Sequence, residues 1–203
     1  MLVLKRTAEF AEWLRGLDSN ARAKVLVRVE RLNKGNPGDV APVGDAVSEM
    51  RIHSGPGYRV YFKQHGDTIT LLYGGDKGSQ DSDIRRAYRK RLGGVAMAKA
   101  QRFDAAEFLD DPETIAAYLT EALRTGDTDY ILQAIGTVAR AEGMTSIAQT
   151  AGLNRESLYR ALDTGGNPQL DTIVKVLDAL GVQLAATPKP AKKRAKKRAL
   201  EHA

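Results

Sequence analysis

The sequence contains no cysteine, only three histidines and a single tryptophan. Without cysteine the chain has neither disulfides nor thiolate metal sites, which fits a reducing compartment. His53, His65 and His202 lack the spacing of metal ligands, so we expect no metal site and no other cofactor. No long apolar run follows the N-terminal basic residues, so we expect no secretory signal, no membrane span and a cytoplasmic location.

Charge divides the 203 residues into three parts. Residues 1–92 carry 17 Lys and Arg against 11 Asp and Glu, a net charge of +6. Residues 93–187 carry 7 against 13, a net charge of −6, and residues 188–203 carry 7 against 1. A basic module followed by an equally acidic one predicts that the two bind each other. The basic tail 188–203 is expected to be disordered, and either adds nonspecific phosphate affinity or merely keeps the chain in solution.

The first 92 residues predict a small α+β domain. A strand at residues 1–5 precedes two amphipathic helices, one starting at Ala8 and one capped by Ser19. After a loop at residues 33–44, turns of Gly-Pro-Gly and His-Gly-Asp separate three expected strands: Val47–His53, Tyr58–Gln64 and Thr68–Tyr73. A last helix is expected over residues 81–92, and the helices should pack on an antiparallel sheet.

Cationic and aromatic side chains punctuate these strands. Strand alternation places Arg51 with His53 on one face, and Arg59 with Tyr61 on one face of the next strand. If those faces coincide, the sheet presents a basic surface suited to RNA phosphates and bases. The alternative is that these are ordinary solvent-facing strand positions without a function.

The segments SEMRIHSGPGYRVYF and LLYGGDKGSQDSDIRRA resemble the HigB-like toxins of the RelE/ParE superfamily, over residues 2–92. The resemblance implies a ribosome-dependent mRNA endonuclease, although the ParE branch inhibits gyrase instead. It aligns Arg51, Arg59 and the Lys77 region with the family's cationic site residues. The tyrosine on the family's final helix falls near Ile84, so the acid and the base stay unassigned.

The chemistry of these side chains suggests a role for each. Arginine is always charged, so Arg51 and Arg59 suit phosphate binding and charge stabilisation. Lys77, on a Gly-Gly-Asp-Lys turn, is suited to holding phosphate or, with a lowered pKa, to transferring a proton. His53 titrates in the useful range, and Tyr61 can stack on a base or donate a hydrogen bond.

Residues 93–102 are expected to form a linker, and residues 103–187 an all-α domain. Pro112 marks the first turn of one helix, and Thr145 and Asn154 are expected to cap the two helices of a helix-turn-helix. The second of these, Arg155–Leu162, is the expected recognition helix, with these residues toward DNA: Asn154, Arg155, Ser157, Tyr159 and Arg160. An ordinary helical hairpin is the alternative.

Residues 97–187 resemble the HigA-like addiction-module antidotes, which have an XRE-type helix-turn-helix fold. The segments FDAAEFLDDPETIAAYLTEAL, GMTSIAQTAGLNRESLYRAL and GNPQLDTIVKVLDALGV carry the resemblance. It implies that this part neutralises the toxin and represses its own operon, with operator DNA and ribosome-bound mRNA as the partners of the two modules. The alternative is a DNA-binding repressor whose N-terminal module is inactive or acts on gyrase.

The segment Asp104–Glu121 should carry the contact between the modules, because it holds six acids and no Lys or Arg. Charge alone would give only a weak contact, since an exposed ion pair contributes about 0–1 kcal/mol to stability. Phe103, Phe108 and Tyr118 are therefore expected as apolar anchors of the contact, within one chain or across a dimer. The alternative places Phe108 and Tyr118 in the antidote's own core.

Overall fold

The computed structural model describes residues 2–80, 82, 99–163 and 165–188. Most of the helix expected over residues 81–92 and nearly all of the basic tail lie outside these ranges. The described elements are, in order, β1 (Val3–Arg6), α1 (Ala8–Arg15), α2 (Ser19–Asn33), β2 (Val40–Gly44), β3 (Val47–Ile52), β4 (Tyr58–His65), β5 (Thr68–Gly75), β6 (Gln101–Arg102), the 3-10 turn η1 (Ala105–Phe108), α5 (Pro112–Arg124), α6 (Thr128–Ala141), α7 (Met144–Thr150), α8 (Arg155–Ala161) and α9 (Leu170–Ala179).

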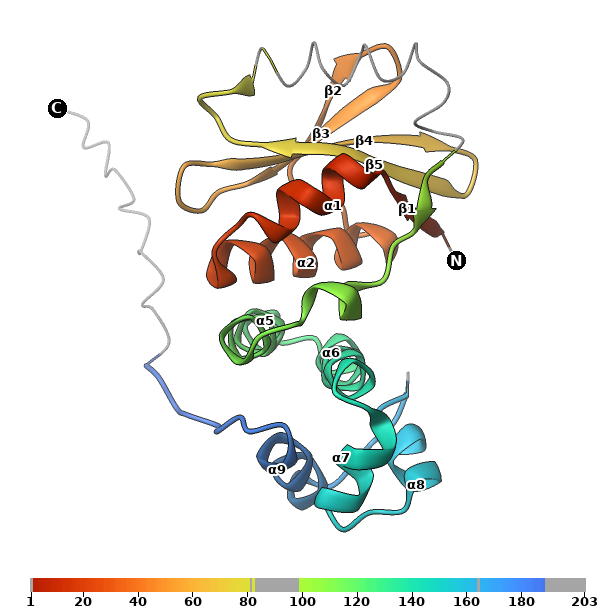
Figure 1. The fold of residues 1–203 in the computed structure, drawn as a ribbon, viewed down its shortest axis with the longest axis vertical. Coiled ribbons are helices and arrows are strands. Elements are labelled where there is room, and N and C mark those ends of the chain that lie inside the picture. The colour runs from red at the N-terminus through yellow and green to blue at the C-terminus, as the bar shows by residue number, and fades with distance from the viewer. Residues whose placement is uncertain (1, 81, 83–98, 164, 189–203) are drawn as a thin grey trace, which may run out of the picture.

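The elements stack in layers along the long axis of the molecule (Figure 1). The sheet forms one end, α1 and α2 lie beneath it, α5 and α6 lie beneath those helices, and α7, α8 and α9 form the other end. No helix of the described ranges has both the length and the apolar character needed to cross a bilayer. The α+β domain is thus followed by a helical region, as the sequence predicted.

The described strands form one sheet in the order β2-β3-β4-β5-β1-β6. Most neighbours are antiparallel, but β1 runs parallel to β5, with Val3 opposite Thr68, so the expectation of a purely antiparallel sheet was wrong. A tight turn cannot join parallel strands, and here a long connection through α1, α2 and three strands separates β1 from β5. The sheet is therefore mixed.

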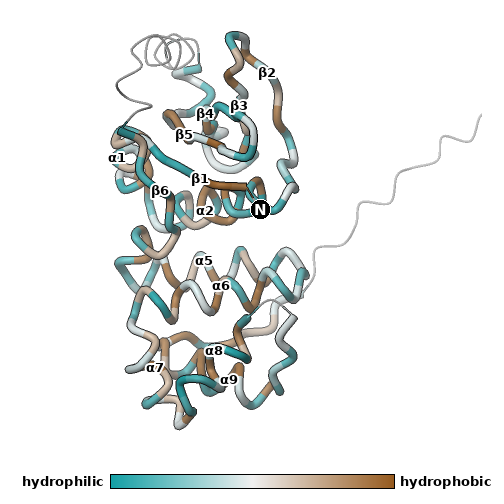
Figure 2. The backbone as a smooth tube through the Cα atoms, turned by 90° about the vertical axis from the view of Figure 1, so that its right-hand side faces the viewer, coloured by the Kyte–Doolittle hydropathy of each residue, from teal (hydrophilic) through white to brown (hydrophobic). Residues whose placement is uncertain are grey.

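Two strands of the sheet lie where the sequence predicted none. Val40–Gly44, inside the expected loop, forms edge strand β2, and an edge strand tolerates Pro42 because its missing N–H need not bond to a neighbour. Gln101–Arg102, at the end of the expected linker, forms β6 and pairs antiparallel with Arg6 and Lys5 of β1. A segment far along the chain thus completes the first domain's sheet (Figure 2).

Side-chain caps determine most of the helix starts. Asp18 accepts a hydrogen bond from the backbone N–H of Ala21 at 3.0 Å, so it caps α2, and Ser19 is the first helical residue and not the expected cap. Pro112 lies in the first turn of α5, as the sequence predicted, and Asp111 caps this helix. In contrast, α7 begins at Met144 after a glycine in the left-handed region and has no side-chain cap, so the role expected for Thr145 was wrong.

One large apolar core extends through both parts of the chain. It includes β-strand residues such as Met50 and Val60, the inner faces of α1 and α2, and the buried residues of α5 and α6. A smaller cluster of Val47, Tyr61 and Leu72 lies apart from it. Because Met50 and Val60 face the helices, the alternate strand positions face the other side of the sheet.

Candidate functional site

The faces of β3 and β4 that carry the cationic residues do coincide. Arg51 lies directly opposite Arg59 in the antiparallel register, and Glu49 lies opposite Tyr61. Their neighbours Met50 and Val60 point into the core that contacts the helices. The two arginines therefore lie side by side on the sheet face away from α1 and α2.

A buried carboxylate holds the two arginines in place. Glu49 has no exposed surface, and its Oε1 accepts a hydrogen bond from Nε of Arg51 at 2.7 Å. Nε of Arg59 lies 3.3 Å from Oε2 of Glu49, and the side-chain amide of Gln80 donates to the same oxygen at 2.9 Å. The hydrogen bond and charge of Glu49 raise the pKa of Arg51. Glu49 was not predicted from the sequence, although its position two residues before Arg51 on a strand places both on one face.

The turn after β5 brings Lys77 close to Arg59. Nη1 of Arg59 donates to the backbone oxygen of Gly57 at 3.0 Å. A Cβ atom built at Gly57 would lie 3.6 Å from Cβ of Lys77 and 3.8 Å from Nη1 of Arg59, so both residues flank this glycine. Asp76 shapes the turn by accepting backbone hydrogen bonds from Gly78 and Ser79. We call Arg51, Arg59 and Lys77 the basic face.

His53 and Tyr61 have different relations to the basic face. Nε2 of His53 lies 2.6 Å from Oδ2 of Asp39, and Nη1 of Arg51 lies 3.7 Å from the other oxygen of that carboxylate. The side chain of His53 is 77% exposed, so it is accessible beside Arg51. Tyr61 is completely buried, so its ring has no exposed face on which a base can stack. The structure therefore places an exposed His53 beside the partly exposed Arg51, whereas the Arg59 side chain is only 11% exposed and the ring of Tyr61 is buried.

The second part of the chain docks on the helix side of the first domain. The N–H of Phe103 donates to the backbone oxygen of Leu4 at 3.0 Å, continuing the β6 pairing. The ring of Phe108 is buried, with the guanidinium carbons of Arg6 and Arg15 lying 5.6 Å and 4.9 Å from its centre. Phe103 stacks on Phe108 and meets Phe10 edge-on. Phe103 and Phe108 thus contact the first domain, as expected for apolar anchors.

Ion pairs surround this apolar contact. Nη1 of Arg22 lies 2.8 Å from Oδ1 of Asp110 and 3.4 Å from Oδ2 of Asp111. Arg6 pairs with Glu107 at 2.5 Å. The hydrogen bonds from Thr114, with the charge of Arg22 nearby, lower the pKa of Asp111. Acidic residues after 103 therefore face basic residues of β1 and α2. We call the contacted surface of β1, α1 and α2 the docking surface.

A buried carboxylate lies at the centre of the docking surface. Glu30 of α2 is 9% exposed, and its Oε2 accepts hydrogen bonds from the hydroxyls of Tyr118 at 2.5 Å and Tyr130 at 2.7 Å. Burial raises the pKa of Glu30, although the two hydroxyls and Lys34 act in the opposite direction. Tyr118 was expected at the contact, whereas Glu30 and Tyr130 were not identified from the sequence.

The segment from α7 to α8 has two short helices joined by a tight turn. Asn154 caps α8 by accepting a hydrogen bond from the N–H of Glu156 at 2.8 Å. Leu158 is buried, and the outer positions of α8 are exposed: Arg155, Ser157, Tyr159 and Arg160. The guanidinium carbon of Arg155 lies 5.5 Å from the centre of the Tyr159 ring. This geometry leaves the predicted recognition residues accessible, while the side chain of Asn154 serves as the cap.

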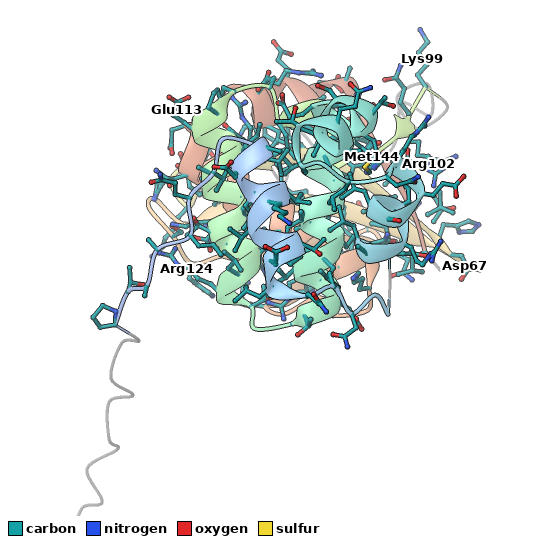
Figure 3. The ribbon with its side chains drawn as sticks, turned by 90° about the horizontal axis from the view of Figure 1, so that it is seen from below. Asp67, Lys99, Arg102, Glu113, Arg124 and Met144 are labelled. Carbon is teal, nitrogen blue, oxygen red and sulfur yellow. The ribbon has the colours of Figure 1, made fainter. Side chains whose placement is uncertain are left out.

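A groove of about 1690 Å³ separates α8 from the first domain. Its lining includes Tyr159 and the cationic residues Lys34, Arg102, Arg140 and Arg160. Seen from below, Arg102 and Met144 lie on the same side of the molecule, opposite Glu113 and Arg124 (Figure 3). Acidic residues of both parts of the chain line the same groove: Glu30, Asp67, Asp104, Glu107 and Asp163.

Two family models match the chain, one for each part. Residues 12–93 match "Phage derived protein Gp49-like", and residues 99–188 match "Probable addiction module antidote protein". Each model covers less than half of the chain, so each part of the chain is similar to one of the two families. The chain joins a Gp49-like domain to an antidote domain, and the pairing of these domains supports a toxin–antitoxin module in one chain.

Two curated proteins of Haemophilus influenzae are similar to parts of the chain, and both bear the name "Uncharacterized protein". One is 48% identical over 86 residues, which make up 41% of this chain and 87% of the relative. The other is 47% identical over 81 residues, 40% of this chain and 84% of the relative. No solved structure matches the chain significantly. The antidote family match begins at residue 99, so β6 of the sheet comes from the antidote domain.

Proposed function

We propose that the Gp49-like domain is a metal-independent, ribosome-dependent mRNA endonuclease, which the antidote domain silences. The observation that carries this proposal is the pairing of Arg51 with Arg59 through the buried carboxylate of Glu49. Because Glu49 fixes both guanidinium groups, they are preorganised to bind a phosphate whose charge increases in the transition state. The HigB-like resemblance of residues 2–92 supports mRNA as the substrate.

Cleavage requires the 2′-hydroxyl of the RNA to lose its proton and attack the adjacent phosphorus. The bond to the 5′-oxygen then breaks, and that oxygen takes up a proton. Arg51 and Arg59 stabilise the charge on the phosphorane, and Lys77 binds a neighbouring phosphate. His53, exposed beside Arg51 and oriented by Asp39, is the residue of this surface that we assign to proton transfer.

Apart from β6, the antidote domain lies on the side of the sheet that α1 and α2 cover (Figure 1). Its aromatic and acidic residues contact β1, α1 and α2, whereas Arg51 and Arg59 lie on the face away from these helices. We therefore propose that it silences the toxin through its bulk, which prevents the Gp49-like domain from reaching mRNA held within a ribosome. On this proposal, the bulk of the antidote domain does not prevent the Gp49-like domain from reaching purified RNA outside a ribosome.

We also propose that α8 binds operator DNA and that the chain represses its own transcription. The exposed side chains of Arg155 and Arg160 support this role, because arginine contacts both phosphates and guanine edges.

The endonuclease proposal is tested by expressing residues 1–98 in growing cells and mapping the ends of cellular transcripts. We expect growth arrest with new 5′ ends inside coding regions. Arg59→Ala should reduce cleavage at least 100-fold, because losing one transition-state contact costs about 3 kcal/mol. The matched control is Arg31→Ala, which removes an arginine from the last turn of α2. Arrest with intact transcripts and inhibited gyrase would instead assign the ParE-like activity.

A further inference from the structure

Three helices from the two domains meet at one buried oxygen atom. Oε2 of Glu30, on α2 of the Gp49-like domain, accepts both tyrosine hydroxyls. Tyr118 comes from α5 and Tyr130 from α6 of the antidote domain, and they are 0% and 1% exposed. The carboxylate and its two donors are thus contributed by different domains, and each is removed from water when the domains dock.

The other contacts of the docking surface are less selective. Arg22 pairs with Asp110 through an exposed hydrogen bond, which any acidic segment can provide. Phe108 packs between Arg6 and Arg15. Another apolar side chain of similar size could occupy the same site. Charge and apolar contact therefore attract many acidic amphipathic helices, and a further feature is needed to discriminate among them.

A buried carboxylate provides that discrimination, because its cost depends on the donors that the partner brings. A buried polar group left without its hydrogen-bond partner weakens association about tenfold to hundredfold, at about 1.4 kcal/mol for each tenfold change. Replacing all the polar partners by apolar groups of similar shape is nearly neutral in comparison. Association is thus weakened when Glu30 lacks its hydroxyl donors, and also when the hydroxyls lack Glu30 as their acceptor.

We propose that Glu30 is the specificity-determining residue of the docking surface, which accepts a helical antidote only when it brings two hydroxyl donors to this carboxylate. The antidote domain of the same chain meets the requirement, and so does that of a second copy. An antidote with phenylalanine at both tyrosine positions is rejected, although it buries the same aromatic rings. The inference goes beyond the proposed activities, because it concerns docking and requires neither RNA cleavage nor DNA binding.

The test uses the full chain with a protease site inserted between residues 93 and 96, cleaved after the protein has folded. The concentration at which the two fragments separate is then measured by analytical ultracentrifugation at fixed pH and salt. We expect the double variant Tyr118→Phe with Tyr130→Phe to weaken association at least tenfold. Glu30→Met alone should weaken it similarly, because both hydroxyls lose their acceptor. Tyr159→Phe, on exposed α8, is the matched control and should change nothing.

The decisive variant combines Glu30→Met with both phenylalanine substitutions. It should recover association to within about threefold of the unsubstituted protein, since no unpaired polar group remains in the contact. Unchanged association of the double phenylalanine variant, or no recovery in the triple variant, would overturn the proposal. Chemical unfolding of the uncleaved variants gives a second readout. Additive effects of Glu30→Met and the phenylalanine pair there would also contradict it, because interacting groups show coupling.

Discussion

The indole ring of Trp13 packs against the backbone of Gly74 so closely that a Cβ atom at Gly74 would overlap it. This contact joins α1 to β5 and leaves no space for any other residue at position 74. We expect Gly74→Ala to lower the free energy of unfolding by about 1–3 kcal/mol, as overpacking does. Thermal unfolding of the full chain measures this.

The control for that substitution is Gly16→Ala. Gly16 has an ordinary helical backbone, with φ −75°, and a Cβ atom there would make contacts no shorter than 3.4 Å. Its melting temperature should stay near that of the unsubstituted protein. Equal effects of the two substitutions would show that the contact with Trp13 is not the cause.

Glu49→Gln should impair the toxin although Glu49 has no exposed surface to present to a substrate. The substitution removes the charge that orients Arg51 and Arg59, so we expect at least a tenfold loss of transcript cleavage by residues 1–98. The buried site should also lose about 1–3 kcal/mol of stability, because polar groups are left poorly paired. Glu12→Gln, at an exposed position of α1, is the control. Full cleavage by the Glu49 variant would remove the positioning role.

Replacing Arg155 and Arg160 by alanine should weaken binding to the DNA upstream of the coding sequence about tenfold or more. If both arginines contact phosphates, the slope of log affinity against log salt should also become shallower by about 2. Fluorescence anisotropy at several salt concentrations measures both effects. Arg124→Ala, an arginine with a 66% exposed side chain on α5, is the control. The same two substitutions are also made in a chain that lacks residues 189–203. If they leave its DNA affinity unchanged, α8 does not bind this DNA.

Stability should depend on pH through Glu30. Burial raises its pKa in the folded state above the ordinary value of 4.5, so the folded protein retains this proton over a range where the unfolded chain has lost it. Stability from this group is present below pH 4.5 and decreases as pH rises through the folded-state pKa. The groups around it are Lys34 of α2, Asp104 before η1, and the two tyrosines.

Glu30→Gln removes this titration and is therefore the comparison to make. We expect the difference in unfolding free energy between Glu30→Gln and the unsubstituted protein to increase in favour of the variant as pH rises above 4.5. Chemical denaturation at a series of pH values measures it. A difference that is constant with pH would show that Glu30 has the same pKa in the folded and unfolded chain.

Local signals predicted the parts of the fold that local chemistry determines. Alternation placed Arg51 and Arg59 on strands, Pro112 marked the start of α5, and Asn154 caps α8. Asp18 and Ser19 are both good caps, so the sequence could not decide between them by residue type. The parallel pairing of β1 with β5 is a long-range relationship that no local pattern encodes.

The buried acids were the main features that sequence reasoning missed. Glu30 and Glu49 resemble ordinary exposed residues in the sequence, because acidic residues are seldom buried. Their burial depends on partners that are distant along the chain: Tyr118 and Tyr130 for Glu30, and Arg59 and Gln80 for Glu49. The strand β6 was missed because two residues of a Gly- and Ala-rich region give no periodicity.

The pairing of β6 with β1 has a consequence for synthesis. The ribosome makes β1 first and Tyr130 about 125 residues later, a delay of roughly 6–25 s at about 5–20 residues per second. During this time the nascent toxin domain has an open edge strand and an uncovered carboxylate at Glu30. Every completed chain then carries one antidote domain for each Gp49-like domain. Premature termination of translation before residue 101 releases a Gp49-like domain that has no antidote domain on the same polypeptide.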